Sequence, residues 1–205
     1  MSFSELKAQD NTKNLFKALS SVAFLAPETA APIEAIQDTT TKEIKALPAE
    51  YKPVGLITED GITFGGDSNE EEVRAHGYTS AVRTDITETS REVTLTALEV
   101  LKENLLEVAY GVDLSAVTRD ATTGELKFDR PQLPENKHWR LIVIVKDGDN
   151  YQARFFPRVK LAAVPEEVWS AADAQSFELA FRAEHDSDLG TAERYFSVIK
   201  PNPAP

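Results

Sequence analysis

Cysteine is absent from this chain of 205 residues. Disulfides, thiolate catalysis and zinc sites built on cysteine are therefore excluded. Tryptophan and tyrosine are also few, with two tryptophans, Trp139 and Trp169, and five tyrosines. An acid–base active site normally lies in a cleft lined by aromatic residues, and no cluster in this sequence indicates one.

Long hydrophobic runs are missing as well. The purest apolar stretches, residues 22–26 and 141–145, are far shorter than the roughly 18 residues needed to cross a bilayer. The first residues lack the basic start and apolar centre of a signal peptide. We expect no membrane insertion by this chain.

Positive charge is in the minority, because 22 Lys and Arg stand against 34 Asp and Glu, for a net charge of −12. A monomeric nucleic-acid binder contacts phosphates through a basic face, which this composition does not favour. The acidic balance fits two interpretations. It serves solubility alone, or it creates a surface that repels DNA through the summed field of an assembly.

Sequence motifs of known catalytic and binding sites are absent too. The chain has no G-x-S-x-G, no phosphate-binding loop, no G-x-G-x-x-G and no H-E-x-x-H. His185 has acidic neighbours, but the turn formers around it predict a solvated loop rather than a metal site. Residues 147–150 resemble the start of a calcium loop with a misplaced glycine. We expect no catalytic residue, no metal and no cofactor.

The chain does contain a change of hydrophobic period near residue 98. Over residues 91–97 apolar and polar side chains alternate, which predicts a half-buried strand. The next apolar residues have the spacing of one helical face, and Gly111 stands where a left-handed cap is expected. We therefore expect a helix from about Leu98 to Tyr110 that packs on the sheet. Its expected core side chains are Leu98, Leu101, Leu105 and Val108.

Later segments predict further strands. Residues 139–145 are almost continuously apolar, as in a strand covered on both faces. Residues 177–182 alternate cleanly between apolar and polar side chains. Pro157 interrupts a third strand region, which implies a sheet edge or a bulge at that position.

The middle of the chain predicts two hairpins and a loop. Residues 56–64 predict a tight hairpin with an Asp60-Gly61 turn. Residues 67–72 predict an acidic loop, either solvated or directed at another subunit. The strand predicted at 78–87 is expected to pair with residues 91–97.

The first 50 residues combine apolar side chains with the helix breakers Pro27 and Pro32. They predict an arm that packs on its own domain and partly on a neighbour. No internal repeat or break in composition marks a second domain. We expect one mainly-β domain over residues 1–205, with an N-terminal arm at 1–50, a β-sandwich core with the helix at 51–200 and an extended tail at 201–205.

Several short motifs, taken in order and spacing, resemble the major tail tube proteins of long-tailed bacteriophages. The motifs are VGLI at 54–57, EDGI at 59–62, AHG at 75–77, VRT at 82–84 and the strand-to-helix unit that ends in Tyr110-Gly111. Residues 11–32, 151–158 and 177–182 are similar to further parts of that family. The resemblance therefore covers most of the chain.

This resemblance implies a two-sheet antiparallel β-sandwich or barrel with one flanking α-helix. It also implies that six copies join edge to edge into a ring, and that rings stack into the tube of a non-contractile, siphophage-type tail. Closure removes exposed sheet edges, which otherwise invite aggregation. The implied partners are further copies of the chain, the tape-measure protein, the tail terminator and baseplate or tip proteins. The expected location is the virion tail, assembled in the host cytoplasm.

The resemblance also suggests roles for polar strand faces and for the arm. An acidic lumen would let double-stranded DNA pass without adhering. The lumen-facing candidates are Arg83, Asp85, Glu88, Glu92, Thr94 and Thr96. The ring-stacking candidates are Leu15, Phe16, Phe24, Leu25, Asp67, Glu70, Glu71 and Glu72.

Two alternatives remain at this point. The chain could form the tube of a contractile tail or a secretion system, since the same fold serves all of these. It could also be a monomeric β-sandwich that binds carbohydrate or mediates adhesion. That module would need exposed aromatic residues on one face or a calcium site in a loop.

Overall fold

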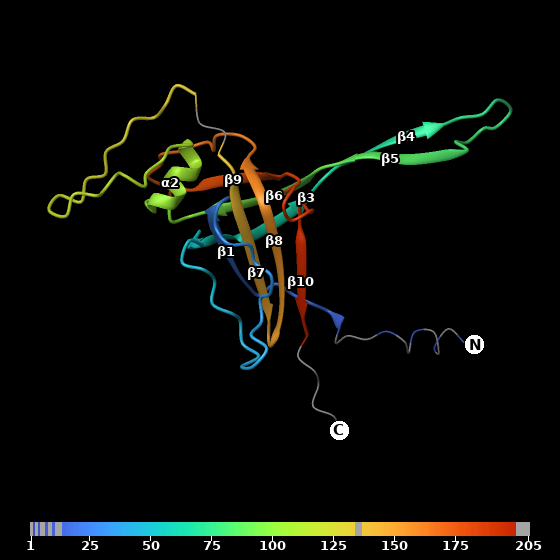
Figure 1. The fold of residues 1–205 in the computed structure, drawn as a ribbon, viewed down its shortest axis with the longest axis horizontal. Coiled ribbons are helices and arrows are strands. Elements are labelled where there is room, and N and C mark those ends of the chain that lie inside the picture. Colours follow the sequence, from blue (N-terminus) through green and yellow to red (C-terminus); the bar gives the residue numbers. More distant parts are fainter. Residues whose placement is uncertain are drawn as a thin grey trace.

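Ten strands and one helix of defined bounds make up the part of the chain that the computed structural model describes: residues 14–133 and 137–199, with Ser2, Ser4, Lys7 and Asp10. The fold is mainly β, as predicted, with an eight-stranded antiparallel sheet, a two-stranded sheet and the short helix α2 (Figure 1). The elements are β1 (Ser20–Pro27), β2 (Lys52–Pro53), β3 (Ile57–Gly65), β4 (Ser68–Val73), β5 (Arg83–Thr89), β6 (Arg91–Ala97), α2 (Glu103–Tyr110), β7 (Trp139–Asp147), β8 (Asn150–Leu161), β9 (Phe177–Ala183) and β10 (Arg194–Val198). The tail expected at 201–205 lies outside the described residues.

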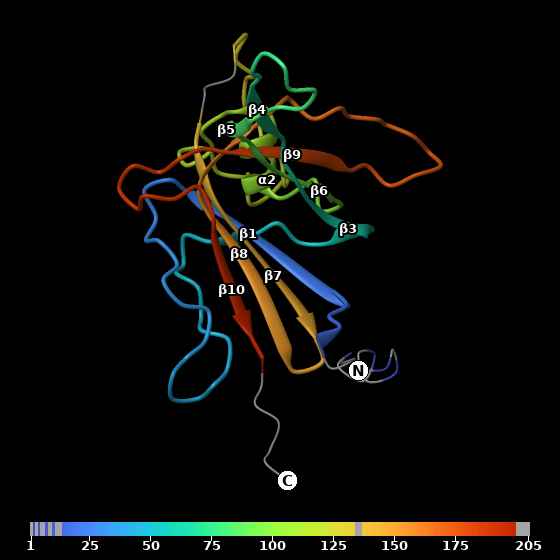
Figure 2. The same ribbon diagram turned by 90° about the vertical axis from the view of Figure 1, so that its right-hand side faces the viewer.

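The long strand β8 divides the main sheet into two halves. The sheet order is β2-β1-β7-β8-β9-β6-β3, and β10 also pairs with β8. The start of β8 pairs with β7 and β10, whereas its end, from Val159 to Leu161, pairs with β9. The first half therefore contains β2, β1, β7, β10 and the start of β8. The second half contains the end of β8 with β9, β6 and β3, and its strands cross those of the first half (Figure 2).

A register shift marks the point where β8 passes from one half to the other. Trp139 lies opposite Val159 but Leu141 lies opposite Phe156, so β8 carries an extra residue around Pro157. Proline has no N–H to donate to the ladder and is accommodated at such bulges. The bulge predicted at Pro157 is confirmed.

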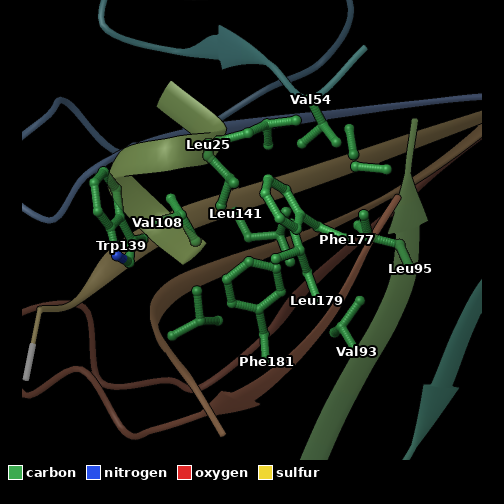
Figure 3. Close-up of a cluster of buried hydrophobic side chains, with 14 of the residues drawn as sticks. Leu25, Val54, Val93, Leu95, Val108, Trp139, Leu141, Phe177, Leu179 and Phe181 are labelled. Atoms are coloured by element: carbon green, nitrogen blue, oxygen red, sulfur yellow. The ribbon is translucent and has the colours of Figure 1, made fainter. Parts of the chain in front are cut away.

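The central core lies between the two halves (Figure 3). It takes side chains from both halves and from α2, which packs beside Leu25 and Trp139. The largest fully buried members are Phe156, Phe177, Phe181, Leu25, Leu95, Leu105, Leu141 and Leu179. Burial of these side chains is the main source of stability for the folded sheet.

The first half is also covered on its other face. Ile142, Ile144 and Phe155 point away from the central core and pack with Ile33 and Tyr51, from the segment between β1 and β2. The Tyr51 hydroxyl donates a hydrogen bond to the Ala31 carbonyl at 2.8 Å and holds that segment in place. The strand predicted to be covered on both faces, residues 139–145, is therefore confirmed.

The N-terminal region packs on its own domain, as predicted for residues 1–50, but it does so through a strand of the main sheet. Strand β1 lies between β2 and β7, and its register with β7 extends over all eight of its residues. Ala23 and Leu25 are buried in the central core, and Ala26 is buried on the opposite face. The alternating small and apolar side chains of β1 fit an interior strand. Residues 14–19, which directly precede β1, belong to no strand.

Helix α2 is shorter than predicted and begins at Glu103 rather than Leu98. The Leu98 N–H donates to the Leu56 carbonyl at 2.9 Å, so the chain still follows β3 there and is not free to form a helical turn. Leu98 is half-buried and Leu101 is 79% exposed, which contradicts their assignment as helix core residues. Leu105 and Val108 are buried, and Gly111 adopts the left-handed cap with φ of 61°, as predicted.

The prediction of two hairpins in the middle of the chain is wrong. Residues 56–64 do not turn back, because Ile57 pairs with Ala97 and Ile62 pairs with Leu95 within one strand, β3. The residues between them bulge outward, with Gly61 at φ of 79°. Strand β5 pairs with β4 rather than with β6.

Candidate assembly surfaces

A long antiparallel hairpin extends out of the second half of the sheet. Strands β3 and β6 form its base and β4 and β5 its outer part. The Ser90 N–H donates to the Asp67 carbonyl at 2.8 Å, and the Asp67 N–H donates to Ser90 Oγ at 3.0 Å, so the ladder continues across the junction. From here on we call residues 68–89 the arm; this segment is distinct from the N-terminal arm that the sequence predicted at residues 1–50. Figure 1 shows it projecting from the body at the end opposite α2.

Gly66 fixes the junction between the arm and the body. A Cβ at this position would lie 2.2 Å from the Ser90 carbonyl oxygen. Only glycine permits so close an approach of the two strands. The sequence requirement at this joint is therefore steric.

The arm has no cover on either face. Every residue of β4 is exposed, and only Asp85 of β5 is half-buried. Large apolar side chains are nevertheless present, with Tyr78 70% and Ile86 64% exposed. An isolated two-stranded hairpin is only marginally stable in water. The arm is therefore a surface suited to contact with another chain.

The structure brings all six lumen candidates onto one face of the long hairpin. In β6, Val93, Leu95 and Ala97 point into the core, so the intervening polar side chains point outward. An extra residue in β5, between Ile86 and Glu88, shifts the register of the arm. The shift places the three β5 candidates on the same outward face as the three from β6. The set is Arg83, Asp85, Glu88, Glu92, Thr94 and Thr96.

Strand β9 adds residues to this outward face that the sequence argument missed. Glu178 lies opposite Thr96, and Arg182 lies opposite Glu92, to which it is ion-paired at 3.0 Å. The alternation of residues 177–182 was visible in the sequence. Their pairing with β6 was not, because the strands are far apart along the chain.

The outward face carries an excess of negative charge. Its carboxylates belong to Glu71, Asp85, Glu88, Glu92 and Glu178, and its cationic groups belong to Arg83, Lys160 and Arg182. Threonine and alanine side chains lie between these charged groups on β6 and β9. The surface is therefore polar, acidic and built from short side chains along its middle.

The edge of the second half is open. Strand β3 is the last strand in the sheet order, with β6 on one side and no paired strand on the other among the described residues. Its backbone groups on that side are available for pairing with another chain.

The ring-stacking candidates lie in three places: before β1, within β1, and along β4 and the residue before it. Leu15 is 76% exposed and Phe16 is half-buried, so both lie at the surface before β1. Phe24 is half-buried within β1, and Leu25 is only 2% exposed in the central core, which contradicts a stacking role for Leu25. The acidic candidates Asp67, Glu70, Glu71 and Glu72 are exposed, but from Ser68 they form strand β4 rather than a loop.

An ionic cluster joins the two halves at the corner of the sheet. Glu184, which follows β9, contacts Lys160 at 2.6 Å, His138 at 3.0 Å and Arg158 at 3.3 Å. Arg158 also pairs with Glu28, which follows β1. The Lys160 hydrogen bond, aided by Arg158, lowers the pKa of Glu184 to about 2. The cluster therefore favours an ionised Glu184 at the corner.

The acidic residues around His185 have a structural explanation. Asp186 is buried, and its carboxylate accepts hydrogen bonds from the N–H groups of Asp188 and Leu189 at 2.9 and 3.0 Å. This geometry closes the turn before β10. No group of three or more His, Asp or Glu side chains suited to a metal ion occurs within the described residues.

In the described part of the chain, every helix is too short or too polar to span a bilayer.

Comparison with known proteins gives one match over nearly the whole chain. A family model described as phage tail tube protein matches residues 8–204. A comparison with curated proteins finds no match.

Proposed function

This chain belongs to the phage tail tube protein family and is a structural, non-enzymatic protein of the phage tail, and we propose that it forms rings of six copies. The rings stack into the tube of a long non-contractile, siphophage-type tail. The tube surrounds the tape-measure protein and later conducts the genome.

The observation that carries this proposal is the construction of the second half of the sheet. Its inner face is sealed by the central core, its outer face is polar and half-buried along β6, and its last strand β3 is paired on one side only among the described residues. A sheet with these properties is completed by copies of itself. Edge-to-edge closure satisfies the backbone groups of β3 and removes an open edge that would otherwise invite uncontrolled aggregation.

In the closed ring, the outward face lines the lumen. Arg83, Asp85, Glu88, Glu92, Thr94 and Thr96 contribute to the wall, together with Glu178 and Arg182. The excess of carboxylates repels DNA phosphates. With a screening length of about 8 Å at physiological salt, the repulsion acts only close to the wall and prevents adhesion.

Stacking between rings uses the arm and the residues before β1. Glu70, Glu71 and Glu72 lie on the arm, Asp67 at its base, and Leu15 and Phe16 on the N-terminal segment. Tail terminator and baseplate or tip proteins bind the two ends of the finished tube. Assembly takes place in the host cytoplasm before the tail joins the virion.

Electron microscopy of the purified protein tests this function. We expect hexameric rings or hollow tubes, and a smallest assembled species with six times the 22.6 kDa mass of one chain. A protein that stays monomeric at high concentration would contradict the proposal. A virion in which a second protein layer surrounds the tube would contradict its non-contractile part.

Charge reversal on the outward face tests the lumen assignment. Tubes of a Glu88→Lys, Glu178→Lys double variant should retain double-stranded DNA at low salt, whereas wild-type tubes should not. Glu125→Lys, at an exposed position away from these strands, serves as the control. Equal DNA retention by the two sets of variant tubes would show that the outward face does not line the lumen.

A further inference from the structure

The arm and helix α2 lie at opposite ends of the same strand. β6 begins directly after the arm and is followed, after a short turn, by α2. Its seven residues span roughly 20 Å at about 3.3 Å per residue. Figure 1 shows the arm and α2 at opposite ends of the body, and Figure 2, turned by 90°, shows both near the top of the view. The arm therefore cannot reach the α2 end of its own chain.

A groove runs beside α2 at this second end. One part has a volume of about 580 Å³ and lies between the edge strand β2 and residues 114–119. A neighbouring part of about 460 Å³ has Leu25 and Trp139 among its lining residues. Lys52, Asn104 and Glu107 line both parts, so the two hollows adjoin each other, and we call them together the α2 groove. The groove offers an apolar floor of a size that admits several side chains.

The rim of the groove contains an exposed leucine and an available cation. Leu101 lines the groove and is 79% exposed, although its spacing in the sequence predicts a core residue. Lys102 and Arg119 are paired with Glu99 and Glu103, at 2.7 and 3.6 Å. Lys52 forms no ion pair with any described residue. Within the described residues, Leu101 is therefore largely uncovered and Lys52 has no acidic partner.

The arm offers complementary groups on the face that points away from the lumen side. Glu70 lies directly opposite Ile86 in the ladder, and both belong to this second face. Ile86 is 64% exposed, and Glu70 forms no ion pair with any described residue. Over residues 68–89 the arm has five acidic and two basic side chains. The groove lining has three basic and three acidic side chains, and among the basic ones Lys52 alone has no ion pair with a described residue.

We propose that the α2 groove is the binding site for the arm of a second copy of this chain in the adjacent ring. Ile86 packs against Leu101, and Glu70 pairs with Lys52. This inference rests on the proposed function and names the partner of the arm. Burial of both apolar side chains and neutralisation of the two unpaired charges supply the driving force.

The contact is head-to-tail, because the surface that binds and the surface that is bound lie at opposite ends. Contacts of this kind do not close on themselves and generate open filaments. The tube consequently has a direction, with free arms at one end and empty grooves at the other.

Disulfide crosslinking tests the contact, because the natural chain contains no cysteine. The Ile86→Cys, Leu101→Cys double variant should, on oxidation of its tubes, give a covalent ladder that extends well beyond six chains. Each single variant should give no ladder. The matched control is Ile86→Cys with Val168→Cys, because Val168 is apolar and 61% exposed but lies outside the groove.

The outcomes separate this inference from the proposed function. Wild-type tubes together with no ladder, or with a ladder that ends at six chains, would overturn the arm-to-groove contact and leave the tube function intact. An absence of wild-type tubes would instead contradict the tube function itself.

A charge exchange gives an independent measurement. Lys52→Glu should reduce the tube yield at low salt at least several-fold, and addition of Glu70→Lys should restore it. Both positions are exposed, so circular dichroism should show both variants folded. A double variant that assembles no better than Lys52→Glu alone would argue against the pairing.

Discussion

In the first half of the main sheet β7 buries side chains on both faces, whereas in the second half β6 buries side chains on one face only. Ile142 of β7 packs under the segment between β1 and β2, away from the central core. Thr94 of β6 occupies the corresponding outer position of its own strand and is only half-buried. The first half is thus covered on both faces within one chain. The second half has an inner face fixed by folding and an outer face that remains available.

The two halves also end differently. The first half places its short edge strand β2 beside the α2 groove. The second half ends in the long strand β3 and continues into the arm. This difference teaches that in the second half stability and assembly are carried by opposite faces of one sheet, and four experiments test that separation.

The largest effect should come from the outer face of the first half. Ile142→Ala removes a fully buried side chain and should lower the free energy of unfolding by about 2–5 kcal/mol. Thr94→Ala, on the outer face of the second half, should change it by less than about 0.5 kcal/mol. Urea unfolding of unassembled protein measures both values. Similar losses for the two variants would remove the contrast between the halves.

Substitution at the joint between body and arm should have a smaller effect on stability. Gly66→Ala forces a Cβ against the Ser90 carbonyl and should cost about 1–3 kcal/mol as the strands move apart. Tube formation should fall more than stability, because the direction of the arm changes. Gly65→Ala is the control, since no atom lies within 4 Å of its added Cβ. Equal assembly by the two variants would show that the joint tolerates displacement.

The ionic corner between the halves predicts a dependence on pH. The pKa of Glu184 is lowered from 4.5 to about 2, so its stabilising contribution is complete above pH about 4.5 and is lost as pH falls towards 2. The loss should be on the order of 1–2 kcal/mol, reduced by partial exposure of the cluster to solvent. Unfolding measured across this range should show a flatter profile for Glu184→Gln than for wild type. A Glu184→Gln profile as steep as that of Glu125→Gln would assign the effect to other groups.

Removal of the arm should have the smallest effect on stability and the largest effect on assembly. Replacement of residues 68–89 by a short Gly-Ser turn removes no buried hydrophobic side chain. The free energy of unfolding should therefore stay within about 0.5 kcal/mol of wild type. Electron microscopy should show no stacked rings. Normal tubes from the shortened chain would assign stacking to the N-terminal segment alone.

Local features of the fold were predictable from local sequence. Alternation in β6 and β9 identifies which side chains enter the core, and the apolar run of β7 identifies a strand covered twice. Gly111 and Pro157 mark a helix cap and a bulge, because each residue type permits few backbone conformations. These signals depend on a few neighbouring residues and can be recognised from the sequence alone.

Strand partners were not predictable in the same way. Glu92 and Arg182 are ion-paired across β6 and β9 although 90 residues separate them. The helix start was misplaced because the spacing of Leu98 and Leu101 suits a helix, while the hydrogen bond from Leu98 to Leu56 keeps the chain extended. Half of the arm was missed for a related reason. A strand was predicted at 78–87, where β5 lies, but β4 was predicted as an acidic loop because all its side chains are exposed and none marks a core strand.

The unbroken passage of β3 and β6 into the arm has a mechanical consequence. A pull on the arm, along the direction of these strands, loads the hydrogen bonds of β6 with β3 and β9 in shear, many at once. Bonds loaded together in this way resist tension far better than bonds that are peeled apart one after another. In the proposed tube, force applied at one end of a tail is thus carried through each subunit by this sheet, and the tube resists stretching without any covalent crosslink.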